Sequence, residues 1–372
     1  MAGKSRKYIL LVLALAAVGF IFYEFGHSAA MKKFDWGVVA ASLRHANLSL
    51  LLLSLAAIYI CYAIRALRWM QFSRTLGRTN FWNVFSATIM GFACSFLLGR
   101  PAEPVRPILI AKKDSLPVAG MFGVYFLERI SDIAATVVLA GFALVLFQGR
   151  GLANDQNAHL MAFARSTGKV LLLGLVAVIA FLVYFRFHGA HWLATRLQEP
   201  KWRVGWREKI VVIVEGFSEG LQGIRGWNDL LLLVVYTALH WVLVAFVYLW
   251  IAHAFGGELA TLDFAGALLV LAFTMVGSVA QLPGVGGGAQ ATSILVFTLI
   301  FGVEQEAAVT VSIVTWLITF AGCCLVGVPL LFREGWSMGE LRRMVREEER
   351  AGEAALVADA ERQPGPAKER TR

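Results

Sequence analysis

The most constraining feature of this sequence is its set of long runs without a charged residue. Eight such runs exist, at 8–23, 45–64, 79–99, 133–149, 170–185, 230–257, 264–303 and 307–332. About 20 apolar residues in a helix cross a bilayer. Charged residues make up only 16% of the chain, against about 25% in soluble domains. The sequence therefore predicts an all-α polytopic membrane protein and excludes an ordinary soluble enzyme.

Two stretches do not fit a single span. The run 264–303 has twice the length that one helix needs, and Pro283 with several glycines stands in its middle. The stretch 81–117 has a similar design, with Gly99 and Pro101 at its centre. Proline removes a helix donor and glycine loosens the backbone, so both helices should break. We expect two half-length helices in each stretch, meeting at a turn within the membrane.

Lysine and arginine placement indicates the topology. Segments 1–7, 65–80, 100–117, 186–228 and 333–372 carry 27 of the 34 Lys and Arg. The proposed outer segments, 26–47, 148–169 and 255–306, carry only six, and the remaining one, Arg129, lies within a span. Because cytoplasmic loops are enriched in these residues, the counts favour six full crossings with both termini in the cytoplasm. A cleaved signal peptide at 8–23 is the alternative to a first span, and the many later spans favour the span.

The broken stretches begin two similar units, 81–147 and 264–332. Pro101 and Pro283 occupy matching places, and the units start from opposite faces of the membrane. Inverted repeats with interrupted helices are typical of transporter binding sites. Coincidental glycine-rich helix packing is the alternative.

The remaining parts of the chain are connectors. A membrane domain over 1–332 contains the basic cytoplasmic connector 186–228, read either as an interfacial helix or as a solvated linker. The charged tail 333–372 should be a cytoplasmic helix with a disordered end.

Charged residues at membrane depth form one cluster. Inserting an ionisable side chain at membrane depth costs roughly 2.5–3.5 kcal/mol, so such residues are expected to have a structural or functional role. The cluster members are Arg100, Glu103, Arg106, Glu128, Arg129 and Asp132. Helical spacing lets Arg129 pair with Asp132 and leaves Glu128 for Arg100 or Arg106. Arg65 and Arg68, after the second span, are read as interface anchors.

Two interpretations of the cluster remain open. It can be a neutralising ion-pair network that holds a bent hairpin. It can also bind a lipid headgroup, because arginine forks suit phosphate oxygens and helix N-termini beside the breaks add free N–H groups.

Signals for an enzyme, a metal or a cofactor are weak. His240 and His253 have no carboxylate nearby in the sequence, and Gly284–Gly288 lacks the Lys-Ser/Thr of a nucleotide loop. The cysteines are read as core residues rather than a metal or redox site: Cys61, Cys94, Cys323 and Cys324. We therefore predict neither a catalytic residue nor a metal or cofactor. A nucleic-acid partner is not predicted either, because the basic residues form no single stripe.

Three motifs resemble a known family. The segment 99–106 reads Gly-Arg-Pro-Ala-Glu-Pro-Val-Arg, 128–132 reads Glu-Arg-Ile-Ser-Asp, and 282–288 reads Leu-Pro-Gly-Val-Gly-Gly-Gly. They are similar to elements of the flippase-like membrane domain that is also the membrane half of lysylphosphatidylglycerol synthetases. The resemblance covers about residues 5–332. The resemblance does not include the soluble aminoacyl-transfer domain of the bifunctional enzymes, so we expect a stand-alone membrane domain.

The resemblance implies a lipid-translocating fold in which both broken hairpins line the path. Gln290 stands where the family often has glutamate, and Trp316 where it often has arginine. The second turn adds these expected substrate-binding residues to the charged cluster: Pro283, Gly284, Gly286, Gly287, Gly288 and Gln290.

The sequence thus predicts a bacterial-type inner-membrane protein that moves an amphipathic lipid with an anionic phosphate headgroup between leaflets. Arg100, Arg106 and Arg129 would hold phosphate. Glu103, Glu128 and Asp132 would orient them or carry protons. The alternatives are a membrane-embedded enzyme acting on a lipid-linked substrate, and a partner subunit of a lipid-modifying enzyme.

Overall fold

The computed structural model describes residues 35–146, 173, 176, 226–335 and 339. This part of the chain is mostly helical, with one two-stranded antiparallel ribbon. Four described helical segments are long and apolar enough to cross a membrane: Leu48–Ser73, Phe81–Leu98, Trp227–Ala254 and Gln305–Arg333. The observation agrees with the predicted helical membrane protein.

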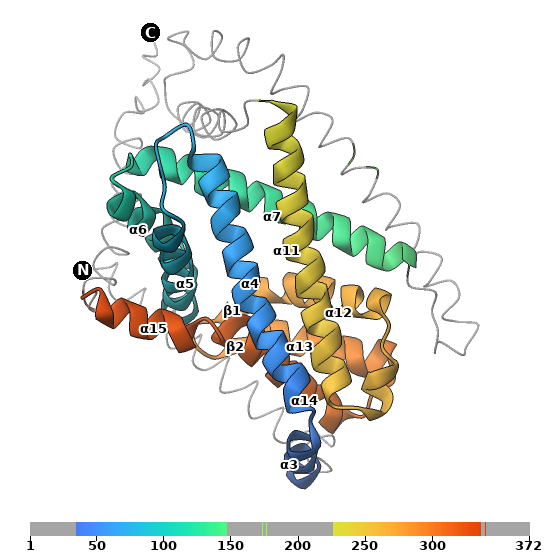
Figure 1. The fold of residues 1–372 in the computed structure, drawn as a ribbon. Helices are drawn as coiled ribbons and strands as arrows, with labels where there is room; N and C mark the ends of the chain where they lie inside the picture. The colour runs from blue at the N-terminus through green and yellow to red at the C-terminus, as the bar shows by residue number, and fades with distance from the viewer. Residues whose placement is uncertain (1–34, 147–172, 174–175, 177–225, 336–338, 340–372) are drawn as a thin grey trace, which may run out of the picture.

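Helices α4 (Leu48–Ser73) and α11 (Trp227–Ala254) form an antiparallel pair (Figure 1). At one end, Asn47 N–H donates to the Ala254 carbonyl at 2.7 Å. At the other end, Gln71 donates to Asp229. The side chain of Asn47 caps α4 by accepting hydrogen bonds from the backbone N–H groups of Ser49 and Leu50 in its first turn. At 1.5 Å per residue, 26 and 28 residues give about 40 Å, enough to cross a bilayer.

The first broken stretch contains α5 (Phe81–Leu98), the 3₁₀ turn η1 (Arg100–Ala102) and α6 (Val105–Asp114). Gly99 ends α5 with a φ of 84°, a value that side-chain-bearing residues rarely adopt. Asn80 N–H then bonds Asp114 at 3.2 Å, so the hairpin returns to the end from which it started. The long helix α7 (Val118–Leu146) follows.

The second broken stretch contains α12 (Phe264–Gly277), the short turn η5 (Ser278–Ala280), strands β1 (Gln281–Leu282) and β2 (Gly286–Gly287), and α13 (Gly288–Leu295). A π-helical turn, η6 (Val296–Ile300), continues α13. Pro283 and Gly284 form the tip of the ribbon, whose register pairs Gln281 with Gly287.

The C-terminal described helix has three parts. They are α14 (Gln305–Trp316), the π-helical turn η7 (Leu317–Ala321) and α15 (Cys324–Arg333). Gly327 lets α15 approach α5 closely, because a Cβ at that position would lie 2.7 Å from the Cβ of Ala93. The helix therefore connects the second broken stretch to the first.

The tips of the two broken stretches touch. Gly284 N–H donates to the Phe96 carbonyl at 2.7 Å. A Cβ on Gly99 would lie 2.8 Å from Cγ of Pro283. Both predicted helix breaks are thus present, and the sequence segments that cause them lie against each other.

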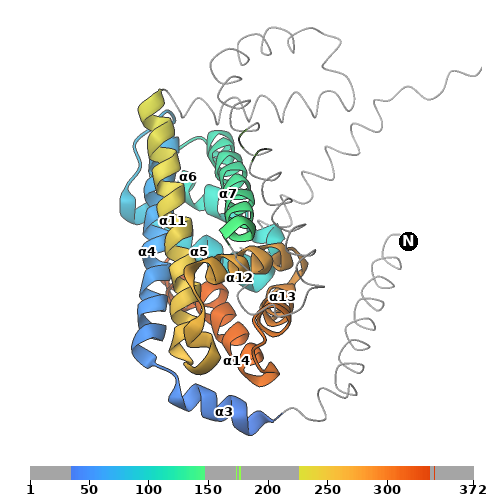
Figure 2. The same cartoon turned by 90° about the vertical axis from the view of Figure 1, so that its right-hand side faces the viewer.

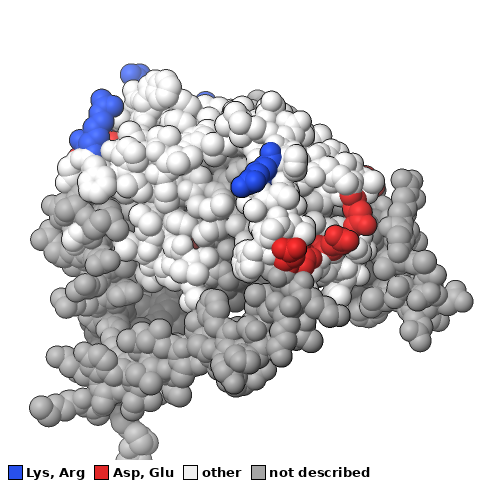
Figure 3. All heavy atoms as spheres, turned by 90° about the horizontal axis from the view of Figure 1, so that it is seen from below, with Lys and Arg blue, Asp and Glu red and all other residues white. Residues whose placement is uncertain are grey.

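The two ends of the described structure differ in charge. One end gathers the basic residues Arg74, Arg78, Lys112, Lys113 and Arg333, and Lys113 pairs with Glu334 there. The other end holds α3 (Trp36–His45), the 3₁₀ turn η4 (Gly257–Thr261) and the start of α14. It bears the acidic residues Asp35, Glu258, Asp263, Glu304 and Glu306. Seen from below, the described surface is mostly uncharged, with a short acidic row (Figure 3).

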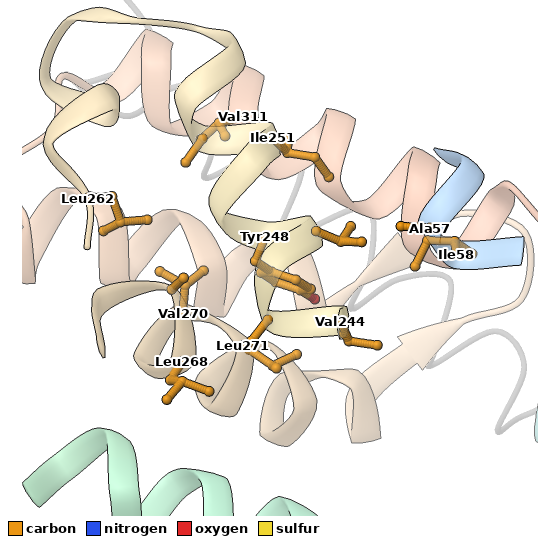
Figure 4. Close-up of a cluster of buried hydrophobic side chains, with 14 of the residues drawn as sticks. Ala57, Ile58, Val244, Tyr248, Ile251, Leu262, Leu268, Val270, Leu271 and Val311 are labelled. Atoms are coloured by element: carbon orange, nitrogen blue, oxygen red, sulfur yellow. The ribbon is translucent and has the colours of Figure 1, made fainter. Parts of the chain in front are cut away.

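Two apolar clusters fill the interior. The larger one joins α4, α11, α12 and α14, with Ile58, Tyr248, Leu271 and Val311 among its members (Figure 4). The second joins the C-terminal part of α4 with α5, α6 and α7, around Trp69. Figure 2 shows the α4–α11 pair along one side of the described structure, with α6 and α7 beside one half of the pair and α12–α14 beside the other.

Some expectations differ from the structure or lie outside it. Helix α5 has 18 residues, so the prediction of a half-length helix is wrong for it, whereas α6 has 10. Helix α3 was not predicted. The predicted span 8–23, nearly all of 170–185 and 186–228, and most of the tail lie outside the described residues.

Candidate functional site

Four charged side chains from two helices form the centre of an ionic network. On α7, Glu128 and Asp132 are four residues apart and share one face. On α4, Arg65 and Arg68 are three apart and face them. Arg65 Nη1 donates to Glu128 at 2.9 Å and to Asp132 at 2.8 Å. Arg68 Nη2 donates to the same two carboxylates at 2.9 Å each.

A third arginine enters from the first broken hairpin. Both terminal nitrogens of Arg106, on α6, donate to the two oxygens of Glu128. The Arg106 guanidinium carbon also lies 4.6 Å from the ring centre of Trp69 and 5.1 Å from that of Phe92. Cation–π contacts of this kind add stability when the cation is desolvated. Gly91 permits the approach, because a Cβ there would lie 2.6 Å from Cβ of Arg106.

The centre of the network is closed to solvent. The exposed side-chain fractions are 0% for Glu128, 1% for Arg68 and 4% for Arg106. A buried charge is tolerated only when it is paired and hydrogen-bonded. These three residues therefore hold α4, α6 and α7 together, and their hydrogen-bonding capacity toward a ligand is largely used.

Glu103, Tyr125 and Arg129 form an exposed edge of the same network. Arg129 is 33% exposed and Glu103 is 28% exposed. Arg129 lies 3.8 Å from Glu103 and 3.6 Å from Glu128. The Tyr125 hydroxyl donates to Glu103. A polar ligand can reach these groups, whereas it cannot reach Glu128.

The second turn contributes backbone and one amide side chain. Arg100 donates to the Ser278 carbonyl at 3.3 Å and so links the two broken stretches. Gln290 accepts from Gly287 N–H at 2.7 Å and donates to the Val285 carbonyl at 3.4 Å. Gln290 thus caps the N-terminus of α13, at a position where the family that the motifs resemble often has glutamate.

The structure places the expected residues in two groups. Arg106, Glu128, Arg129, Asp132 and Glu103 come together in the ionic network. Arg100 instead lies with the second turn, whose expected residues are Pro283, Gly284, Gly286, Gly287, Gly288 and Gln290.

Two sequence interpretations are wrong. Arg65 and Arg68 are not interface anchors, because both are buried and paired. The predicted Arg129–Asp132 pair is replaced, since both carboxylate oxygens of Asp132 accept from Arg65 and Arg68 and the ion pairs of Arg129 go to Glu103 and Glu128. A sequence signal for the first correction existed: two arginines at helical spacing match two carboxylates at helical spacing.

The two histidines singled out in the sequence lie on α11 and are not part of the ionic hydrogen bonds. His253 contacts the Leu262 carbonyl at 2.8 Å, and His240 is buried on α11. No group of three or more His, Cys, Asp and Glu residues that could hold a metal occurs among the described residues.

Long apolar helices around a buried ionic network define a helical membrane protein. The chain belongs to the family described as the lysylphosphatidylglycerol synthase TM region, whose model matches residues 9–327. The predicted family membership is thereby confirmed, and it indicates a function related to membrane lipid. No curated protein matches the chain at a significant level.

Proposed function

We propose that this protein translocates an amphipathic phospholipid between the leaflets of the membrane. The family supports a lipid-related role. The observation that carries the proposal is the meeting of two broken hairpins that start from opposite ends of the structure. Interrupted helices at the centre of a membrane protein are typical of transporter binding sites, because their unpaired backbone groups can contact a polar substrate.

The opposite origins of the hairpins follow from their end contacts. The first hairpin begins and ends beside Asn80 and Asp114, at the basic end. The second begins at Asp263, at the acidic end, where His253 bonds the Leu262 carbonyl. Their tips meet at Phe96 and Gly284. The arrangement supports an inverted repeat of units 81–147 and 264–332.

In this mechanism the two units rock against each other. The ionic network joins α4 to α6 and α7 of the first unit as one rigid body, since several charge-assisted hydrogen bonds would break if these helices separated. At the tips, the polar links between the two broken stretches are the Gly284–Phe96 backbone bond and the Arg100–Ser278 bond. A rearrangement at the tips would open the exposed edge of the network, formed by Glu103, Tyr125 and Arg129, first to one side of the membrane and then to the other.

The charge difference between the ends supports an orientation. Lys and Arg collect on the cytoplasmic side of bacterial-type inner-membrane proteins. The end with Arg74, Arg78, Lys112 and Lys113 would then face the cytoplasm. The acidic end would face outward, and six crossings would put both termini in the cytoplasm.

Purified protein in liposomes tests the proposal. Headgroup-labelled phospholipids of several classes should cross faster than in protein-free vesicles, with and without an imposed proton gradient. No acceleration for any class would contradict the proposal.

The same vesicles separate translocation from lipid chemistry. A membrane-embedded enzyme would leave a new lipid species, which mass spectrometry of the extracted lipids would detect. A partner subunit of a lipid-modifying enzyme would neither move lipid nor produce a new lipid species unless that enzyme is present.

A further inference from the structure

The four arginines of the ionic network differ in how their donors are used. Arg65 and Arg68 each donate to two carboxylates at 2.8–2.9 Å. Arg106 donates from both terminal nitrogens to Glu128. The distances of Arg65 and Arg68 are those of charge-assisted hydrogen bonds. All three guanidinium groups are thus held by carboxylates of the protein, and the side chains of Arg68 and Arg106 are almost fully buried.

Arg129 is held differently. Its nearest carboxylate oxygens lie at 3.6 and 3.8 Å, beyond hydrogen-bond distance. Its buried Nε finds no hydrogen-bond partner among the described residues. The guanidinium carbon lies 5.3 Å from the ring centre of Tyr125, which orients the group without using its donors. Arg129 therefore keeps a fork of free N–H groups on a partly exposed side chain.

The charges of the network do not balance. Arg65, Arg68, Arg106 and Arg129 face three carboxylates, Glu103, Glu128 and Asp132. One positive charge remains. Among the described residues, Arg68 also has an Nε without a hydrogen-bond partner, but its side chain is only 1% exposed. Arg129 combines unused donors with a side chain that is 33% exposed, so it is the network arginine that a ligand can reach. An excess charge in a low-dielectric region attracts a counter-ion of opposite sign.

From these observations we infer that Arg129 is the headgroup-binding residue and that it selects lipids with one net negative charge on a phosphodiester. The inference rests on the proposed lipid translocation and assigns the substrate class at that site. A phosphodiester offers two oxygens to the guanidinium fork. A zwitterionic headgroup satisfies the fork but adds a cation beside four arginines, so it binds less well.

Glu103 explains how Arg129 is kept in place without a ligand. The Tyr125 hydroxyl holds Glu103, and Glu103 lies 3.8 Å from Arg129. This distance leaves a weak ion pair instead of a bidentate bond. When a phosphodiester binds, Arg129 exchanges this weak contact for short hydrogen bonds, while Tyr125 keeps Glu103 from following. Glu103 is thus a positioning residue.

Native mass spectrometry of the full chain, released from vesicles of equal phosphatidylglycerol and phosphatidylcholine, tests the inference. The unmodified protein should retain phosphatidylglycerol preferentially. Arg129→Gln should reduce that preference about tenfold, because a charge-assisted pair of hydrogen bonds is lost. Arg129→Lys should keep part of it, since the charge remains and the fork does not. Arg44→Gln, on exposed α3, should leave it unchanged.

Several outcomes would overturn the inference. An unchanged preference in Arg129→Gln would do so, provided that its thermal unfolding midpoint matches the unmodified protein. An equal loss in Arg44→Gln would indicate general surface charge. Displacement of the lipid by millimolar inorganic phosphate would show that the site takes free phosphate rather than a headgroup.

The liposome assay separates this inference from the proposed function. If Arg129→Gln loses its lipid preference while the unmodified protein moves no lipid, Arg129 binds headgroups and the translocation proposal fails. If the unmodified protein moves lipids and Arg129→Gln keeps both rate and preference, translocation stands and the assignment of Arg129 fails.

Discussion

The Nη2 atom of Arg68 lies 2.9 Å from Oε1 of Glu128, and the exposed fractions of the two side chains are 1% and 0%. These residues are 60 positions apart in the sequence. The bond fixes α4 against α7 at the point where Arg106 also reaches Glu128. A single carboxylate therefore holds three helices together.

Replacing this carboxylate should strongly destabilise the protein. Glu128→Gln keeps the shape but leaves Arg106, Arg65 and Arg68 facing one charge fewer in a buried site. Removing one partner of a buried ion pair costs about 3–5 kcal/mol. Thermal unfolding in detergent should show a clear decrease of the midpoint.

Glu258→Gln is the control for this change, because Glu258 is exposed in the turn η4. An exposed substitution should alter the free energy of unfolding by no more than about 0.5 kcal/mol. Equal midpoints for the two variants would mean that the ionic network does not stabilise the fold.

Much of the site could be predicted from the sequence where local rules apply. Gly99 and Pro283 break helices through their backbone chemistry alone, so the positions of both turns were foreseeable. The pairing of Glu128 with Arg106 was among the predicted options, because few opposite charges exist at membrane depth. In both cases the constraint is carried by the residue itself.

Arg65 and Arg68 were misread because their role depends on tertiary contacts. They follow the charge-free run 45–64, which suggested that the helix reaches the membrane surface there. Helix α4 continues to Ser73, since Trp69 and Phe72 pack in the second apolar cluster. Which face of α4 meets α7 cannot be read from either helix alone. The Tyr125 bond to Glu103 was missed for the same reason.

The close contact between α12 and α13 should not tolerate a methyl group. A Cβ on Gly277 would lie 2.3 Å from the Gly288 carbonyl oxygen and 2.2 Å from Oγ1 of Thr292. The helices must separate to accept Gly277→Ala, and overpacking of this kind costs about 1–3 kcal/mol. We expect a lower unfolding midpoint and slower lipid translocation in liposomes.

Gly226→Ala is the matched control for that variant, because nothing lies within 4 Å of a Cβ at position 226. Its φ of −161° is open to any residue. Normal translocation by Gly277→Ala would show that close packing of the second hairpin is not required for function.

The amide of Gln290 should matter as a cap and not as a charge. Its Oε1 accepts from Gly287 N–H at 2.7 Å at the start of α13. Gln290→Leu removes this acceptor, and loss of a helix cap costs about 0.5–2 kcal/mol. Gln290→Glu keeps an acceptor and places a negative charge at a helix N-terminus, which is favourable.

The two substitutions at Gln290 should therefore separate in a thermal melt. Gln290→Leu should unfold at a lower temperature than the unmodified protein, and Gln290→Glu should not. A decrease of the same size in both would indicate that the donor bond to the Val285 carbonyl, at 3.4 Å, is the important one.

The charge difference between the two ends predicts which positions are reachable from outside the cell. Arg78 lies in the exposed loop after α4 at the basic end, and Glu258 lies at the acidic end. Single cysteines at these positions can be compared in a Cys324→Ala background, because Cys61, Cys94 and Cys323 are buried. A membrane-impermeant maleimide should label Glu258→Cys in intact cells. It should label Arg78→Cys only after permeabilisation, since basic loops remain in the cytoplasm. The reverse pattern would contradict the orientation, and labelling of both positions in intact cells would contradict placement of the two ends on opposite sides of the membrane.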